Sequence, residues 1–172
     1  MNLRETILEE HSKQQTMKIV RWIGSDKERF KELLKLFLKG EYLVAQRAAW
    51  PLSYCAMEHP GFAKPYLKKL LENLKRPNLH NSVKRNTIRL LQDFDIPEEL
   101  HGLVAEICFG YISSVTEPVA VKCFSMSVLA NICKKHSELS KEFKMIIEAQ
   151  LPYSTAGFRS RAKRTFKELN LE

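Results

Sequence analysis

Residues 44–52 read VAQRAAWPL, and their order of large and small side chains returns three more times along the chain. The matching stretches are VKRNTIRLL at 83–91, VKCFSMSVL at 121–129 and FRSRAKRTF at 158–166. Each stretch begins with a large apolar residue, has a small residue four positions later, and has another large apolar residue four positions after that. Because residues four apart share one face of an α-helix, each stretch predicts an amphipathic helix whose small residue lets a neighbouring helix approach closely.

The aligned positions agree in residue size at all four places, and the stretches recur every 37 to 39 residues. A period of about forty residues with two helices in each period is typical of stacked helical hairpins that share a core. The first positions hold Val44, Val83, Val121 and Phe158, the middle positions hold Ala48, Thr87, Ser125 and Ala162, and the last hold Leu52, Leu91, Leu129 and Phe166.

These four stretches make the sequence resemble the HEAT-repeat and armadillo-like superfamily of α-solenoids. The first and last stretches also keep a basic residue followed by alanine, which many such repeats show, whereas the two middle stretches do not. The resemblance implies an all-α fold, a right-handed α-α superhelix of about four helical hairpins with an N-terminal capping helix. We expect a single domain over residues 1–172, with the cap at 1–23 and repeats at about 25–61, 62–96, 97–136 and 137–172.

Local signals predict where several helices begin and end. We expect the N-terminal segment to break near His11. Ser25 is the expected cap of the next helix, and Gly40 is expected to end it. Either Asn81 or Ser82 is expected near the start of the helix that contains the second stretch.

Pro51 lies inside the helix of the first stretch, directly after Trp50. Proline cannot donate a hydrogen bond to the carbonyl of Arg47, and its ring crowds that carbonyl. We therefore expect a kink at this point, with Trp50 displaced from helical angles.

The composition favours a soluble protein with anionic partners. The chain has 28 lysines and arginines against 20 acidic residues, a formal net charge of +8, which attracts nucleic acid or acidic proteins. No apolar run approaches the ~20 residues of a membrane span, and the N-terminus lacks the apolar core of a secretory signal. We expect a cytoplasmic protein that does not bind membranes. Its four cysteines form no Cys-x-x-Cys pair, which predicts buried free thiols.

The resemblance implies that the second helix of each hairpin lines a concave surface where partners bind. The step of 100° per residue points Ser53, Cys123 and Ala130 to this side, together with a set of basic and aromatic residues. Tryptophan and arginine are frequent anchors of protein interfaces. In a second interpretation, Trp50 packs under the N-terminal segment and the arginines form a solvated face. The predicted binding residues are Arg47, Trp50, Tyr54, Arg85, Arg89, Arg161 and Arg164.

The sequence contains no motif of an enzyme. Glycine-rich phosphate loops, a Gly-x-Ser-x-Gly elbow and a His-Glu-x-x-His zinc motif are all absent, so we expect no catalysis and no cofactor. Cys55 with His59, and Cys133 with His136, have helical ligand spacing, but each supplies two ligands where a structural zinc takes four. We therefore expect no metal.

Two functions remain in competition. The first is a non-enzymatic scaffold whose concave face binds an acidic protein segment. The second is a nucleic-acid-binding protein related in fold to DNA-alkylation-repair glycosylases, some of which use a similar solenoid with aromatic residues and an acid in the groove. Asp93 is the nearest acid here, but the catalytic arrangement of that family is not matched.

Overall fold

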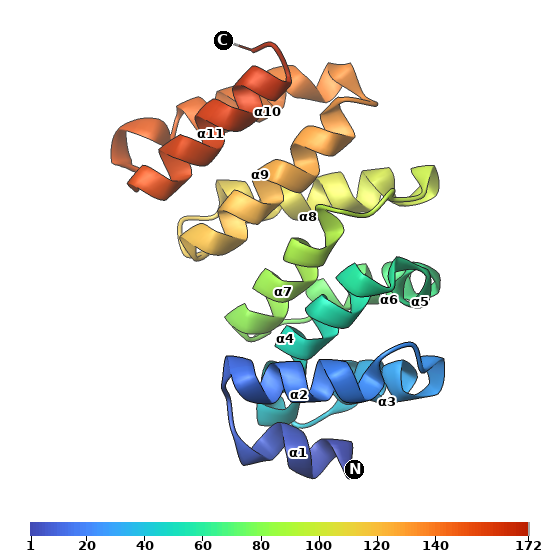
Figure 1. Ribbon diagram of the computed structural model, residues 1–172. Helices are drawn as coiled ribbons and strands as arrows, with labels where there is room; N and C mark the ends of the chain where they lie inside the picture. The colour runs from blue at the N-terminus through green and yellow to red at the C-terminus, as the bar shows by residue number, and fades with distance from the viewer. Residues whose placement is uncertain (172) are drawn as a thin grey trace. The chain divides into compact units, whose positions relative to one another are not determined.

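The computed structural model describes residues 1–171, which form α-helices, short 3-10 helices and brief connections, with no strand among them (Figure 1). The predicted all-α fold is confirmed. Contacts between residues divide the chain into two compact units, Met1–Phe94 (unit 1) and the part from Asp95 onward (unit 2), and each is described by itself.

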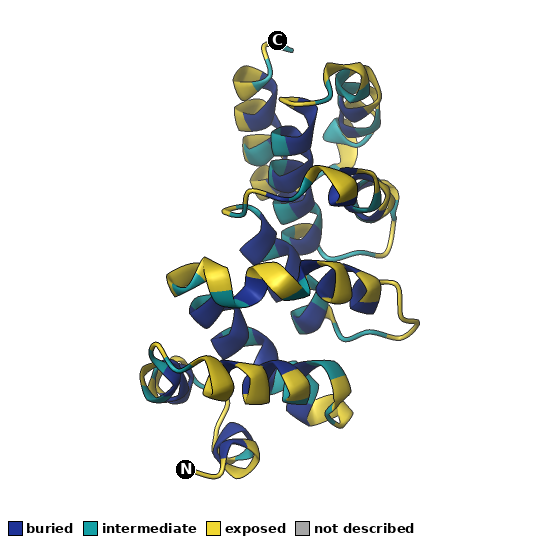
Figure 2. Ribbon diagram, turned by 90° about the vertical axis from the view of Figure 1, so that its right-hand side faces the viewer, coloured by how far each residue is buried: buried dark blue, intermediate teal, exposed yellow. Residues whose placement is uncertain are grey.

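Unit 1 is organised around α4, which contacts α1, α2, α3 and α7. Its buried residues lie along α4 and on the inner sides of the neighbouring helices, whereas the outer sides of those helices are exposed (Figure 2). The elements of this unit are α1 (Leu3–Glu9), α2 (Lys13–Ile23), α3 (Lys27–Lys39), α4 (Tyr42–Glu58), α5 (Pro60–Ala63), η1 (Lys64–Tyr66), α6 (Leu67–Leu74) and α7 (Asn81–Leu91).

Unit 2 is organised around α9, which contacts α8, α10 and α11. Phe143 and Phe158 are fully buried and supply the largest side chains of its core. The elements of this unit are η2 (Glu98–Leu100), α8 (His101–Ser113), α9 (Val119–Cys133), η3 (Ser137–Leu139), α10 (Ser140–Glu148), η4 (Leu151–Tyr153) and α11 (Ala156–Glu168).

The repeated positions form the core, as predicted. All of the aligned large and small residues are buried, from Val44 in α4 to Phe166 in α11. Burying a large aliphatic side chain contributes about 1.5–3 kcal/mol, so the repeat accounts for a substantial part of the driving force for folding. The four cysteines are also buried and free, in agreement with the prediction.

The N-terminal segment breaks where expected. The side chain of Ser12 accepts a hydrogen bond from the amide of Gln15 at 3.1 Å and caps α2. The Gln15 side chain then donates to the carbonyl of Thr6 at 2.6 Å and to a carboxylate oxygen of Glu9 at 2.9 Å, which ties the end of α1 to the start of α2. The residues between these helices include His11, so the predicted break is confirmed.

Two predicted caps are wrong by one or two positions. Asp26, not Ser25, caps α3, and its carboxylate accepts from the amides of Glu28 and Arg29 at 2.9 and 3.1 Å. His80 caps α7 in place of Asn81 or Ser82, with its ring Nδ1 accepting from the amide of Ser82 at 3.0 Å. The acceptor lies one position later than predicted in α3, and one or two positions earlier than predicted in α7. Gly40 ends α3 as predicted.

Pro51 does not interrupt α4, which runs as one helix from Tyr42 to Glu58. The expectation that Trp50 leaves helical angles is therefore wrong. Pro51 is buried, and the hydroxyl of Ser53 donates to the carbonyl of Trp50 at 2.8 Å. Helices pack on several sides of α4, and their contacts hold its backbone in helical geometry despite the missing hydrogen bond.

The outward orientation predicted for Ser53, Cys123 and Ala130 is also wrong, since all three are buried. The 100° rule assumes one buried face and one solvent face. Both α4 and α9 contact several other helices, so each is buried on more than one side. Within the described chain, no helix is long and apolar enough to cross a membrane.

Candidate functional site

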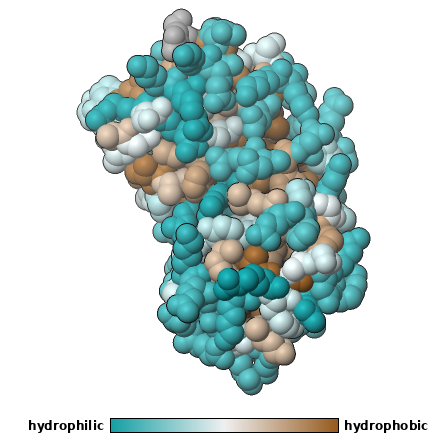
Figure 3. All heavy atoms as spheres, in the orientation of Figure 1, coloured by the Kyte–Doolittle hydropathy of each residue, from teal (hydrophilic) through white to brown (hydrophobic). Residues whose placement is uncertain are grey.

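Five of the seven predicted binding residues lie on α4 and α7, which pack against each other in unit 1. The hydroxyl of Ser82 near the start of α7 donates to the carbonyl of Gln46 in α4 at 3.2 Å. This bond fixes the two helices side by side at Gln46, one turn before Trp50. Figure 3 shows the side of the protein that faces the viewer in Figure 1, which is mostly hydrophilic with smaller hydrophobic patches.

Trp50 is half-buried and lies against the N-terminal segment. Its ring centroid is 5.9 Å from that of His11, in a tilted arrangement. The exposed imidazole covers part of the indole and leaves the remainder open to solvent. The structure therefore combines both interpretations of this residue: the N-terminal segment contacts Trp50 but does not enclose it.

Arg47 has a structural partner. Its Nη1 donates to the carbonyl of Leu8 at 2.8 Å, near the C-terminal end of α1. Carbonyls in the last turn of a helix lack intrahelical donors, so the guanidinium satisfies an acceptor that would otherwise need water. Arg47 thus attaches α1 to α4.

Arg89 and Tyr54 form a cation–π pair across the α4–α7 contact. The guanidinium carbon lies 5.3 Å from the centroid of the tyrosine ring. Arg85, one turn earlier on α7, is exposed. Within residues 1–171, neither arginine forms an ion pair with an acidic side chain. Their charges therefore remain available to an external anion.

His80 completes the basic and aromatic cluster of unit 1. Its ring centroid lies 5.2 Å from that of Tyr42 in an edge-on arrangement. Burial lowers the pKa of His80, and the charges of Arg85 and His11 lower it further. We call the set His11, Trp50, Tyr54, His80, Arg85 and Arg89 the α4–α7 face.

The other two predicted residues lie on α11 in unit 2 and are engaged by their own neighbours. Arg161 donates from Nη1 to the carbonyl of Cys123 at 3.2 Å, also bonds the Ser127 hydroxyl, and lies 5.8 Å from the ring of Phe124. Burial lowers the pKa of Arg161, and the neighbouring charge of Arg164 adds to that effect.

Arg164 is exposed but has two partners in unit 2. Its Nη2 donates to the Ser127 hydroxyl at 3.3 Å, and its Nε lies 3.5 Å from a carboxylate oxygen of Glu168. Because Arg161 and Arg164 already have partners within unit 2, they are weaker candidates for binding an external ligand than the arginines of α7.

Sequence reasoning missed His11 and His80 as members of the α4–α7 face. Both lie just before a helix, outside the repeated pattern, so the alignment of the second helices could not include them. A polar residue one position before a predicted helix is the only signal that could have pointed to His80. Asp93 is exposed in the turn after α7.

The two pairs with helical ligand spacing, Cys55 with His59 and Cys133 with His136, do not belong to larger groups of metal-binding side chains among the described residues. No group of three or more histidine, cysteine, aspartate or glutamate side chains in the described part of the chain could hold a metal ion. His136 instead faces another imidazole, with its Nε2 2.9 Å from Nδ1 of His101.

A model of the HEAT repeat domain family matches residues 3–169. The chain therefore belongs to the HEAT repeat domain family, and the resemblance seen in its four repeated stretches is confirmed. Searches of curated proteins and of solved structures found no match. Proteins built from such helical repeats present extended surfaces and often act as scaffolds in protein interactions.

Proposed function

We propose that this protein is a non-enzymatic scaffold that binds an acidic protein segment on the α4–α7 face. The observation that carries the proposal is the pair of arginines on α7, of which Arg85 is exposed and Arg89 lies over the ring of Tyr54. Neither has an acidic partner among the described residues.

The stacking of Arg89 on Tyr54 supports a binding role for its guanidinium. A side chain held against an aromatic ring has already lost part of its conformational freedom, so less entropy is lost when a ligand binds. Its planar N–H groups can then meet a carboxylate through two parallel hydrogen bonds. Arg85 supplies a second guanidinium one turn away on the same helix.

Trp50 supplies the apolar part of the same face. It is half-exposed beside His11, and tryptophan is among the residue types that contribute most to binding energy at interfaces. An acidic segment that also carries a large apolar side chain would place its carboxylates over α7 and its apolar group against the indole. The net charge of +8 favours encounter with such a segment.

Catalysis is not part of this proposal. The α4–α7 face has arginines, histidines and aromatic rings, and no acidic residue is among its members. No nucleophile with an adjacent base is among its members, and the four thiols are buried.

A selection from a random peptide library tests the proposal without assuming a sequence for the partner. We expect the selected peptides to be enriched in aspartate and glutamate together with a large apolar residue. Their affinity, measured by fluorescence anisotropy, should fall at least ten-fold in an Arg85→Gln/Arg89→Gln variant, because two charged hydrogen-bonding groups are lost.

Lys163→Gln/Lys167→Gln is the matched control, because it removes the same charge from two exposed positions of α11. The control should bind within about two-fold of the wild type, since neither lysine belongs to the α4–α7 face and exposed charges are screened at physiological salt. Enrichment of basic or neutral peptides would overturn the proposal. An equal loss of peptide affinity in the α7 variant and in the α11 control would also overturn it.

A further inference from the structure

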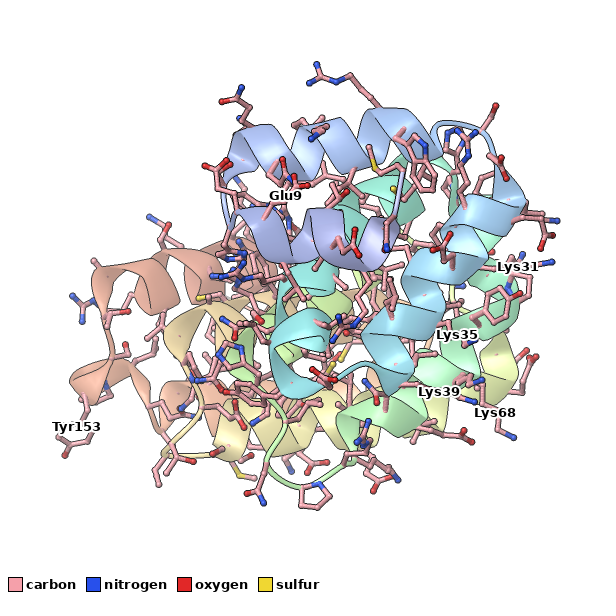
Figure 4. The ribbon with its side chains drawn as sticks, turned by 90° about the horizontal axis from the view of Figure 1, so that it is seen from below. Glu9, Lys31, Lys35, Lys39, Lys68 and Tyr153 are labelled. Carbon is pink, nitrogen blue, oxygen red and sulfur yellow. The ribbon has the colours of Figure 1, made fainter. Side chains whose placement is uncertain are left out.

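Unit 1 carries a second basic surface, formed by α3 and α6 rather than by α4 and α7. Lys27, Lys31, Lys35 and Lys39 recur at every fourth position of α3, and all four are exposed. Residues at this spacing lie on one side of a helix, about 6 Å apart along its axis. Figure 4 shows Lys31, Lys35 and Lys39 extending outward on the same side as Lys68 of α6.

A groove of about 200 Å³ lies between these helices. One wall comes from α3, and the other comes from η1 and α6. Four lysines and the half-exposed ring of Tyr66 meet in it, above two leucine side chains. The lining residues are Lys31, Leu34, Lys35, Leu38, Lys39, Tyr66 and Lys69.

The positive charge of the groove is largely uncompensated. Glu28 pairs with Lys31, with 2.6 Å between the ammonium nitrogen and a carboxylate oxygen. Among the residues that the structure describes, no acid pairs with Lys35, Lys39 or Lys69. The repulsion between these ammonium groups would be relieved by an anionic ligand.

The walls of the groove are held together at both ends. Near the start of α3, the ring of Phe30 contacts the ring of Phe62 in α5, the short helix directly before η1, with centroids 5.6 Å apart. At its end, Nη1 of Arg76 donates to the carbonyl of Leu38 and to the side-chain oxygen of Asn73, at 3.2 Å in each case. The groove is therefore preorganised, which lowers the entropic cost of binding.

We infer that the α3–α6 groove binds the backbone of a single-stranded nucleic acid. Proteins that hold single strands combine a positively charged groove, which follows the phosphates, with aromatic side chains on which bases stack. The lysines of α3 and Lys69 supply the first feature, and Tyr66 supplies the second.

Two other anionic partners fit this surface less well. A membrane-binding surface needs large apolar side chains that enter the lipid, and α3, η1 and α6 have no exposed one among the described residues. A duplex keeps its bases stacked inside, so none of them could stack on the tyrosine in the wall of the groove.

Fluorescence anisotropy with a labelled oligothymidylate of about 12 nucleotides tests the inference. At ~50 mM salt the wild type should bind, because counterion release is most favourable at low salt. A Lys35→Gln/Lys39→Gln variant should bind at least ten-fold more weakly. Its slope of log affinity against log salt should be shallower by about 1.4, since each phosphate contact to a single strand contributes about 0.7.

The control Lys163→Gln/Lys167→Gln removes the same charge at the same spacing on α11 and should bind within about two-fold of the wild type. Tyr66→Leu should weaken binding by about five-fold or more with an unchanged salt slope, because stacking is lost but no phosphate contact is. Thermal unfolding of each variant verifies that the exposed substitutions leave the fold intact.

Three results would overturn the inference. The first is no binding by the wild type at ~50 mM salt, where electrostatic binding is strongest. The second is an equal loss of oligonucleotide affinity in Lys35→Gln/Lys39→Gln and in the control Lys163→Gln/Lys167→Gln. The third is a preference for duplex DNA, for vesicles with anionic lipid or for an acidic peptide over the single strand. The Arg85→Gln/Arg89→Gln variant should keep its oligonucleotide affinity, which separates this site from the proposed protein-binding face.

Discussion

At the scale of single residues, His80 makes the start of α7 sensitive to acid. Its Nδ1 accepts hydrogen bonds only while the ring is neutral, and it receives one from the amide of Ser82. Burial and the charges of Arg85 and His11 lower its pKa from the usual 6.5. The stabilisation is therefore present above about pH 6.5 and is lost as the pH falls through the lowered pKa.

We predict that His80→Ala destabilises the protein by about 1 kcal/mol at neutral pH, because an N-cap is lost. His80→Asn should retain most of the stability, since asparagine is a good N-cap whose acceptor does not titrate. Urea unfolding at pH 7.5 and pH 4.5 checks both variants. The difference in the free energy of unfolding between the wild type and His80→Ala should be smaller at pH 4.5 than at pH 7.5. An equal difference at both pH values would show that the ring does not act as a cap.

Arg47 illustrates how one predicted binding residue acquires a structural role. We predict that Arg47→Met costs about 1 kcal/mol, because the carbonyl of Leu8 loses its donor while the aliphatic packing is largely kept. Hydrogen exchange of the α1 amides should accelerate in this variant more than exchange in α7. Unchanged exchange in α1 would mean that the bond does not hold this helix in place.

At the scale of helices, Gly40 permits the close approach of α3 and α4. A Cβ atom at this position would lie 2.3 Å from the carbonyl oxygen of Leu36 and 2.9 Å from a methyl group of Val44. Gly102 and Gly110 lie in α8, where an added Cβ would meet no atom within 4 Å.

We predict opposite effects for alanine at these glycines. Gly40→Ala should destabilise by about 1–3 kcal/mol, as expected for overpacking against backbone. Gly102→Ala should stabilise by up to about 1 kcal/mol, because glycine is unfavourable inside a helix. Thermal unfolding of the two variants under identical conditions checks this, and shifts in the same direction would contradict it.

The helices and their buried stripes could be predicted from the sequence because they depend on local periodicity. Val44, Ala48 and Leu52 repeat in size at fixed spacing, and a helix with that pattern must bury that side. The burial of Ser53 and Ala130 could not be predicted, since it depends on how many neighbours surround α4 and α9. The bond from Arg47 to Leu8 joins residues far apart in sequence, so no local pattern encodes it.

At the scale of the whole molecule, the buried thiols make the free energy of unfolding decrease at alkaline pH. Burial raises the pKa of Cys55 and Cys108 to about 12 and that of Cys133 to about 11, from an ordinary value of 9.0. Above about pH 9 the unfolded chain loses these protons while the folded chain keeps them. The stabilisation is therefore full below about pH 9 and is lost as the pH rises towards 11–12.

We predict that the free energy of unfolding falls steadily above pH 9, by up to about 1.4 kcal/mol per pH unit for each such thiol. Cys108→Ala removes one of these groups and should make the decline shallower. Urea titrations between pH 8 and 10.5 provide the comparison. Parallel declines for the wild type and the variant would rule out a contribution from this thiol.

The family assignment and the all-α fold rest on the whole chain, whereas the two basic surfaces rest on unit 1 alone. The right-handed superhelix, the number of hairpins and the repeat boundaries remain predictions. The candidate sites could be predicted in part, because arginine and tryptophan on a second helix are visible in the alignment. The interaction partners of each arginine could not be predicted from the sequence. These partners distinguish Arg161 and Arg164, which bond to residues of unit 2, from Arg85 and Arg89, which have no acidic partner among the described residues.

The most direct test of the α4–α7 face is the fluorescence of Trp50 in a Trp22→Phe variant, where it is the single tryptophan. Saturation with a selected acidic peptide should move its emission to shorter wavelength, because the exposed part of the indole leaves water. Adding Arg85→Gln/Arg89→Gln should abolish that shift at the same peptide concentration. An unchanged emission at full saturation with the peptide would contradict binding at this face.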